Sequence, residues 1–273
     1  MERNRSVRNW IEDLPKRGRI AFSIDDVKNQ FPDLSKRALQ SLMCRLVSKG
    51  QVCSVWKNYY VVIPAEYALR GTVPPIEYID NLMKHLGHEY YVGLLNAASL
   101  YGSSHQQPQS FMVISNSKDI KSKISHNINL RFFIKSYIND EFIQRKNASY
   151  GEINISNPVM TALDLVMYEN RIGGLERIAA VLDGLADELN IVDSNPALWN
   201  SFPIPVVQRL GYIMEIVLGY SELGEAIYKK ICTMGNGFRK NHLDPRLKQE
   251  NSVDYPYDSR WKLYINTILE VEQ

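Results

Sequence analysis

The first seventy residues combine a helical pattern with a basic surface, and this combination constrains the chain most strongly. They contain 13 Lys and Arg against 7 Asp and Glu, whereas residues 71–273 contain 19 against 23. Neutralising phosphates releases their counterions, which supplies affinity for nucleic acid whatever the base sequence. The charge distribution therefore predicts a small DNA-binding module ahead of a larger, slightly acidic domain.

Helix-capping residues and apolar spacing divide this module into short helices. Residues 4–14 place apolar side chains at helical spacing, and Pro15 closes the segment. Ser23 can accept hydrogen bonds from free amides, so a second helix is expected over residues 24–30. The proline that follows Phe31 prevents this helix from continuing.

A third helix and a hairpin complete the module. Ser35 is expected to begin the helix, and Gly50 to end it in the left-handed conformation. The expected buried stripe of this helix comprises Leu39, Leu42, Leu46 and Val47. Alternating residues on both sides of Lys57-Asn58 predict two antiparallel strands. The order helix, helix, turn, helix and hairpin predicts a winged helix-turn-helix over residues 1–70.

The third helix and the hairpin tip carry the candidate DNA-binding residues. A helix fits the DNA major groove, and its first turns direct side chains toward bases and phosphates. Arg37 can pair with guanine and Gln40 with adenine, whereas Lys57 is suited to contact phosphate. The predicted DNA-binding residues are Ser35, Lys36, Arg37, Gln40, Ser41, Arg45, Lys57 and Asn58. A solvated helix face without DNA contact is the alternative interpretation.

The larger domain, residues 71–273, is predicted to combine a small β-sheet with a C-terminal helical bundle. Within its α/β part, residues 71–156, the expected strands are residues 111–114, 131–134 and 151–155. Residues 157–273 open with an asparagine cap followed by proline and are predicted to be mainly helical. Residues 233–258 are expected to form a long loop. The predicted fold class is therefore α+β, mainly helical.

Metal, disulfide and membrane classes are not favoured. Cys44, Cys53 and Cys232 are far apart and lack the spacing of zinc ligands. The sequence shows no secretory signal and no apolar run of about 20 residues. We therefore expect no metal, no cofactor, no membrane contact and a cytoplasmic location.

Gly102-Ser103 resembles the opening of a nucleotidyltransferase site, in which carboxylates would hold magnesium. Residues 103–117 contain no Asp or Glu, so catalysis is not expected here. His105 has no charged partner nearby in sequence and is expected to pack or form a turn. Glycine-rich residues 234–240 lack the spacing of a phosphate-binding loop and are expected to be flexible. The chain is predicted not to be an enzyme.

A longer stretch of sequence carries a family resemblance. Residues 90–102, with the sequence YYVGLLNAASLYG, and residues 105–108 resemble the AbiEi antitoxin family. Further similarity lies in residues 157–165, 173–175 and 260–263. The resemblance covers the whole chain, and the segment 105–108 with the preceding small residues is its more specific part.

The resemblance implies an antitoxin and transcriptional repressor from a type IV toxin–antitoxin system, of the kind that acts in abortive infection against phage. In this family the amino-terminal winged helix binds inverted repeats in the operator of the shared operon. The C-terminal domain counters a nucleotidyltransferase-like toxin of the AbiEii type, and direct contact between antitoxin and toxin is not implied.

Two alternatives stay open at this point. The chain could be a winged-helix regulator whose larger domain senses a small molecule, or it could be an active nucleotidyltransferase. The sequence does not identify the operator, the target of the toxin, the residues that carry antitoxicity or the oligomeric state.

Overall fold

The chain folds into two compact units, each assembled from several segments. The computed structural model describes residues 6–103, 108–125, 128–235, 237–247 and 255–270. Unit 1 comprises residues 1–91, 109–139 and 145–155, and unit 2 comprises residues 92–108, 140–144 and 156–273. The boundary expected near residue 70 falls inside unit 1 and stays a prediction.

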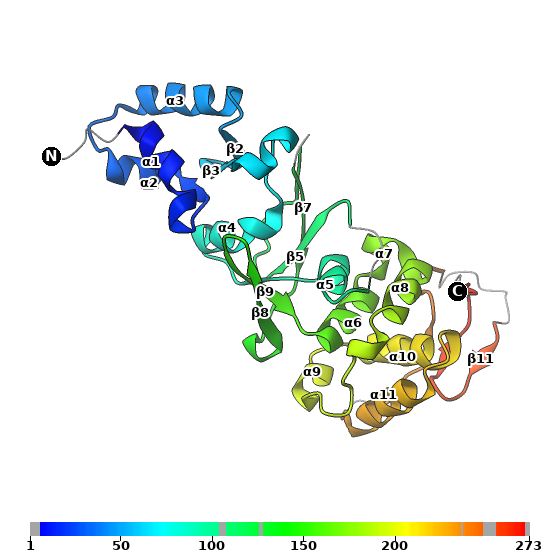
Figure 1. The fold of residues 1–273 in the computed structure, drawn as a ribbon. Helices are drawn as coiled ribbons and strands as arrows, with labels where there is room; N and C mark the ends of the chain where they lie inside the picture. Colours follow the sequence, from blue (N-terminus) through cyan, green and yellow to red (C-terminus); the bar gives the residue numbers. More distant parts are fainter. Residues whose placement is uncertain (1–5, 104–107, 126–127, 236, 248–254, 271–273) are drawn as a thin grey trace. The chain divides into compact units, whose positions relative to one another are not determined.

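Unit 1 begins with three helices and a three-stranded sheet (Figure 1). In chain order the elements are α1 (Val7–Asp13), β1 (Ala21–Ser23), α2 (Ile24–Gln30), α3 (Lys36–Ser48), β2 (Val52–Trp56) and β3 (Tyr59–Val62). The strand order is β1-β3-β2, and both neighbouring pairs are antiparallel. The predicted helices and hairpin are present, and α2 has the predicted bounds. Strand β1 is not predicted, because a three-residue strand has too little periodicity to be recognised.

One hydrophobic cluster holds these elements together. Its buried members come from all three helices and all three strands and are Val7, Trp10, Ile11, Leu14, Phe22, Val27, Leu39, Met43, Leu46, Val52 and Val62. The Trp10 ring meets Phe22 and Phe31 edge-on, at centroid distances of 5.9 and 6.3 Å. Edge-to-face contact is a favoured geometry for aromatic pairs, so these rings fix α1 against β1 and the end of α2.

A second sheet has six strands in the order β6-β7-β5-β4-β9-β8 and lies in unit 1 apart from a few residues at strand ends. Its strands are β4 (Tyr90–Val92), β5 (Phe111–Ser115), β6 (Lys123–Ser125), β7 (Ile128–Ile134), β8 (Ile143–Ala148) and β9 (Gly151–Ser156). Strand β7 is parallel to β5 and antiparallel to β6. All three β-prone runs of the sequence are confirmed as strands.

Within unit 1 the hairpin contacts the six-stranded sheet directly. Trp56 at the end of β2 meets Phe132 of β7 with ring centroids 6.0 Å apart, and the Lys123 ammonium lies 5.9 Å from the Trp56 ring. Tyr59 of β3 packs against His85 of α4 (Ile79–Leu86) at 4.7 Å. The first seventy residues are therefore packed against the rest of unit 1 through several aromatic contacts.

Unit 2 is built mainly from helices. They are α5 (Leu94–Leu100), α6 (Pro158–Met167), α7 (Glu169–Ile172), α8 (Gly174–Asp183), α9 (Pro196–Asn200), α10 (Ile204–Tyr212) and α11 (Ser221–Thr233). The Asn157 side chain accepts a hydrogen bond from the Met160 amide and Pro158 occupies the first turn, which confirms the predicted start of α6. Helix α10 continues into one π-helical turn, Ile213–Val217.

The end of unit 2 adds a small sheet of β10 (Asn241–His242), β11 (Tyr257–Asp258) and β12 (Leu263–Tyr264), in the order β10-β12-β11. The expectation of a long loop over residues 233–258 is therefore wrong at β10 and β11. Trp261 is fully buried against Gly211 of α10, where an added Cβ would lie 2.0 Å from the indole ring. Only glycine leaves room for this ring.

The architecture is α+β, as predicted, with several small sheets. In the part of the chain that the structure describes, no helix has both the length and the apolar character that crossing a bilayer requires.

Candidate nucleic-acid interface

Helix α3 has a buried face that fixes its place in unit 1. Leu39, Met43 and Leu46 are almost fully buried in the hydrophobic cluster, and Leu42 is partly buried beside them. Spacings of three and four residues place these side chains on one side of the helix. The predicted stripe is wrong at Val47, which is 40% exposed, because Met43 occupies the inward position between Leu39 and Leu46.

Both ends of α3 are closed in the predicted way. The Ser35 hydroxyl accepts a hydrogen bond from the Ala38 amide at 3.2 Å, so Ser35 is the cap of the helix. Gly50 has φ +65°, and its amide donates to the Val47 carbonyl at 2.9 Å. A glycine in the left-handed region is a common end for a helix because it has no Cβ to clash.

The opposite face of α3 is exposed along its length. The candidates on this face are Lys36, Arg37, Gln40, Ser41 and Arg45, all of them exposed. The Arg45 Nε donates a hydrogen bond to the Ser41 carbonyl at 3.3 Å, which holds the Arg45 side chain against the helix. In Figure 1, α3 lies at the upper edge of unit 1, beyond α1 and α2. The structure thus brings the five helix candidates together on one accessible surface.

The hairpin places Lys57 and Asn58 at its tip. Both are exposed, and Asn58 has φ 58°, a left-handed conformation that asparagine adopts more readily than most residues. The Asn58 carbonyl accepts a hydrogen bond from the Ile24 amide at 2.9 Å, which ties the tip to the start of α2. The sequence misses this tie because it depends on the pairing of β1 with β3.

The cations of the first seventy residues differ in whether an acid pairs with them. Four that lie on and around α1 and α2 form the ion pairs Arg8–Glu12, Lys16–Asp13, Arg19–Asp26 and Lys28–Asp25. By contrast, no carboxylate of a described residue forms an ion pair with Lys36, Arg37 or Lys57. Exposed ion pairs contribute little stability, but they do cancel charge. Uncompensated positive charge therefore lies on the outer face of α3 and at the hairpin tip, and also at Arg17, Lys49 and Arg70, none of which forms an ion pair with a described carboxylate.

Two acidic residues at the start of α2 lie close to this tip and are themselves compensated. Asp26 accepts hydrogen bonds from the Ser23 amide and from Arg19, both at 2.7 Å. Burial opposes the ionisation of Asp26, but the hydrogen bonds from Ser23 and the charge of Arg19 outweigh it and hold the pKa below its usual value. Asp25 pairs with Lys28 at 3.0 Å. These carboxylates therefore oppose an approaching phosphate less than free acids would.

The positions singled out for chemistry form no metal site among the described residues, which hold no group of three or more His, Cys, Asp or Glu side chains suited to an ion. Gly102 has φ +85° and Ser103 is buried, just after α5. His105 lies outside the described residues. Phe238, in the glycine-rich segment, packs against Tyr228 with centroids 4.9 Å apart, so the segment is anchored at this point.

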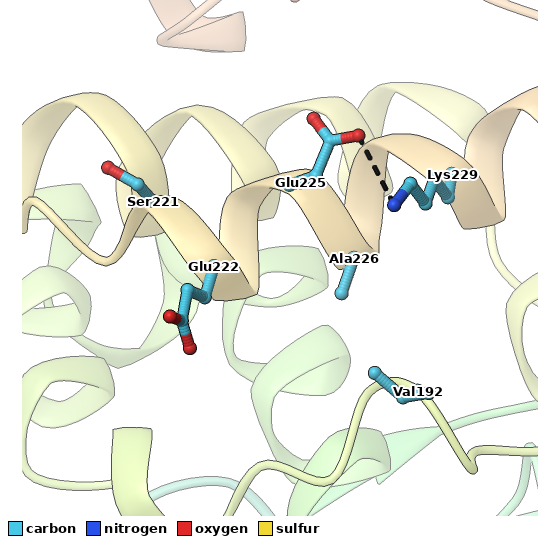
Figure 2. A pocket seen from close by; sticks show the side chains of 6 residues that line it. All are labelled: Val192, Ser221, Glu222, Glu225, Ala226 and Lys229. Carbon is cyan, nitrogen blue, oxygen red and sulfur yellow. Dashed lines mark ion pairs between the residues drawn. The ribbon is translucent and has the colours of Figure 1, made fainter.

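Unit 2 carries a groove of about 440 Å³ beside α11 (Figure 2). It is lined by Val192, Ser221, Glu222, Glu225, Ala226 and Lys229. Figure 2 shows Val192 on a facing segment and the Glu225 carboxylate directed toward the Lys229 ammonium, at 3.6 Å. Pockets for small molecules usually enclose most of the ligand with apolar walls. A groove formed largely by one helix encloses little, so it does not strengthen the ligand-sensing alternative.

Comparison with known proteins adds a family and a fold. Residues 91–216 match the family model described as the AbiEi antitoxin C-terminal domain. The fold is similar to that in the crystal structure of RV2827C protein from Mycobacterium tuberculosis, with a TM-score of 0.65 and 12% identity over 93% of this chain and 89% of that one. At this identity the likeness concerns the fold alone. No curated protein sequence matches the chain.

Proposed function

Because the chain belongs to the AbiEi antitoxin family, we propose that it is the antitoxin of a toxin–antitoxin pair and represses its own operon through residues 1–70. In this proposal residues 1–70 are a winged helix-turn-helix and residues 71–273 carry the antitoxin activity. The observation that carries the DNA-binding part is the uncompensated positive charge on the outer face of α3 and at the hairpin tip.

The arrangement of α3 suits the major groove. Its inner face is committed to the hydrophobic cluster, so its outer face is the one that can enter DNA. Arg37 and Gln40 lie in the first turns of the helix and are exposed, which allows bidentate hydrogen bonds to guanine and adenine, respectively. Lys36 and Lys57 are exposed point charges suited to phosphate.

The other predicted residues have supporting roles in this proposal. The Ser35 side chain caps α3, so its role in this proposal is to fix the start of the helix that contacts DNA and not to bond to a base. Ser41 and Arg45 lie further along the exposed face, suited to the DNA backbone. Asn58 shapes the tip that carries Lys57.

The partners follow from the family. The proposed DNA partner is a double-stranded operator with inverted repeats, and the proposed functional partner is a nucleotidyltransferase-like toxin of the AbiEii type. Antagonism in a type IV pair needs no stable contact between the two proteins. The proposed location is the cytoplasm, where both partners are accessible.

Gel shifts with the promoter of the chain's own operon test the DNA-binding part. Removing one bidentate base contact, in Arg37→Ala or Gln40→Ala, should weaken binding by about 1–3 kcal/mol and relax the preference at one base pair. Arg145→Ala is the matched control, because Arg145 is an exposed cation on β8, paired with Glu152. Unchanged affinity and specificity in both α3 variants would refute the proposed readout.

Two further assays test the remaining parts. When this chain is co-expressed with a nucleotidyltransferase-like toxin encoded in the same operon, cells that the toxin alone arrests should grow. Growth arrest despite co-expression would refute the antitoxin role. The proposal contains no catalytic step by this chain. Transfer of labelled nucleotide by the purified protein would contradict that part.

A further inference from the structure

The small C-terminal sheet carries three aromatic side chains in one row. His242 of β10 is the register partner of Tyr264 of β12, and Tyr264 is the partner of Tyr257 of β11. The ring centroids of His242 and Tyr264 are 5.3 Å apart, and those of Tyr264 and Tyr257 are 5.0 Å apart. We call these three residues the aromatic row.

The aromatic row lies on the outer face of the sheet. Successive residues of a strand point to opposite faces, and Leu263, which precedes Tyr264, is fully buried. Leu243, which follows His242, is buried as well. Tyr257 is 40% exposed, and His242 and Tyr264 are partly exposed. The apolar residues therefore form the inner face, and the row lies on the outer face with its three side chains partly exposed.

Positive charge surrounds this row although the larger part of the chain is acidic. Residues 237–247 and 255–264 contain five Lys and Arg against two acids, whereas residues 71–273 contain 19 against 23. The Lys240 ammonium lies 5.6 Å from the Tyr257 ring, and Arg239 beside it is exposed. Arg246 pairs with Asp244, Arg260 pairs with Glu215 and Glu225, and Asp258 accepts the Trp261 amide. Arg239, Lys240 and Lys262 therefore carry the positive charge near the row that no described acid pairs with.

The segments that bear the row are held firmly by unit 2. The Gln208 side-chain amide of α10 donates to the carbonyls of Arg239 and Trp261, at 2.8 and 2.6 Å. The Trp261 indole donates to Glu215 at 2.6 Å. Because these segments are already held in place, they lose little conformational entropy when a ligand binds to the aromatic row.

We propose that the aromatic row and its flanking cations bind single-stranded nucleic acid. Unpaired bases expose flat faces that stack on Tyr and His rings, and each such stack contributes affinity with little dependence on base identity. Lys240 and Arg239 attract the backbone phosphates. This surface is independent of α3 and does not rest on the proposed operator binding. A duplex keeps its base faces covered, so it would bind the row less well.

The test measures fluorescence anisotropy of the full chain with labelled oligo(rU) and oligo(dT) 12-mers, and with a duplex that lacks the operator. Tyr257→Ala should weaken binding of the single strands about fivefold or more. Tyr257→Phe keeps the ring and should bind like the wild type. Tyr137→Ala is the matched control, because Tyr137 is an exposed tyrosine of unit 1. Circular dichroism checks that each variant is folded.

The role of charge has its own variant. Lys240→Ala should reduce the slope of log Kd against log salt by about 0.7, the value for one phosphate contact on a single strand. Lys229→Ala, which removes an exposed lysine from α11, should leave the slope unchanged. A preference for oligo(rU) over oligo(dT), or the reverse, identifies RNA or DNA as the natural source.

The outcomes separate this proposal from operator binding. Tyr257→Ala should keep operator affinity, and Arg37→Ala should keep single-strand affinity. The proposal is overturned if neither 12-mer binds where the operator is saturated, or if Tyr257→Ala binds the single strands like the wild type. It is also overturned if Arg37→Ala abolishes single-strand binding, because α3 would then be the only nucleic-acid surface. Equal affinity for the single strands and the duplex would likewise refute base stacking.

Discussion

Helix α3 and the C-terminal sheet both present exposed cations, but different side chains accompany the charge. On α3 the neighbour is the hydrogen-bonding amide of Gln40, whereas on the sheet the neighbours are the rings of the aromatic row. Duplex bases offer only their edges, which hydrogen bonds can read, whereas unpaired bases offer their faces. From this comparison we infer that exposed cations provide general affinity for nucleic acid, whereas the side chains beside them determine whether a duplex or a single strand binds.

The largest effect is expected from Trp261→Ala, which removes the support of one surface and leaves the other intact. Trp261 is fully buried and meets Tyr228 and Phe238, so truncation should cost about 3–5 kcal/mol in the stability of unit 2. Urea unfolding followed by circular dichroism measures the loss, and gel shifts should show unchanged operator binding. A loss below about 1 kcal/mol would show that Trp261 does not anchor the C-terminal sheet.

A smaller effect distinguishes unpaired cations from paired ones in the first seventy residues. Lys36→Ala and Lys57→Ala should each lower the slope of log Kd against log salt for the operator by about 0.9, because each removes one phosphate contact. Over a fourfold range of salt this amounts to about 3.5-fold in Kd. Lys16→Ala serves as control, since Lys16 is paired with Asp13 at 2.8 Å. If the slopes of Lys36→Ala and Lys57→Ala equal that of Lys16→Ala, then neither α3 nor the hairpin tip contacts the phosphates of the operator.

The smallest effect concerns Asp26, the acid of the capping box at the start of α2. The pKa of Asp26 is lower in the folded protein than in the unfolded chain, so its contribution is present above pH 4 and is lost as the pH falls through the lowered pKa. The side chain is 34% exposed, and solvent screening limits the loss to a few tenths of a kcal/mol. Comparing Asp26→Asn with wild type in urea unfolding at pH 3 and pH 7 checks this. If the two proteins differ more in free energy of unfolding at pH 3 than at pH 7, the prediction is wrong.

The sequence predicts the N-terminal elements well because local signals define them. Ser23 and Ser35 mark the starts of α2 and α3, and Gly50 marks the end of α3, each through a hydrogen bond or dihedral angle that depends on nearby residues. These signals place the candidate residues of α3 on its exposed face. Whether those residues contact DNA stays a prediction.

What the sequence misses depends on pairing between distant segments. Strand β1 pairs with β3, and β10 pairs with β12, across long separations in the chain. The aromatic row is invisible in the sequence because His242 and Tyr264 become neighbours only through that pairing. The error at Val47 has another cause. Helical spacing is compatible with burial of either Met43 or Val47, and in the folded protein the surrounding residues bury Met43 and leave Val47 exposed.

The contact of Trp56 with Phe132 has a practical consequence for dissecting this protein. A fragment that stops at residue 70 would keep α3 but lose the partners that cover Trp56 and Tyr59, namely Phe132 and His85. Newly uncovered rings favour self-association, and the fragment would lose stability with them. Helix α3 should therefore be studied in a protein that also contains Phe132 and His85, which lie in later stretches of unit 1.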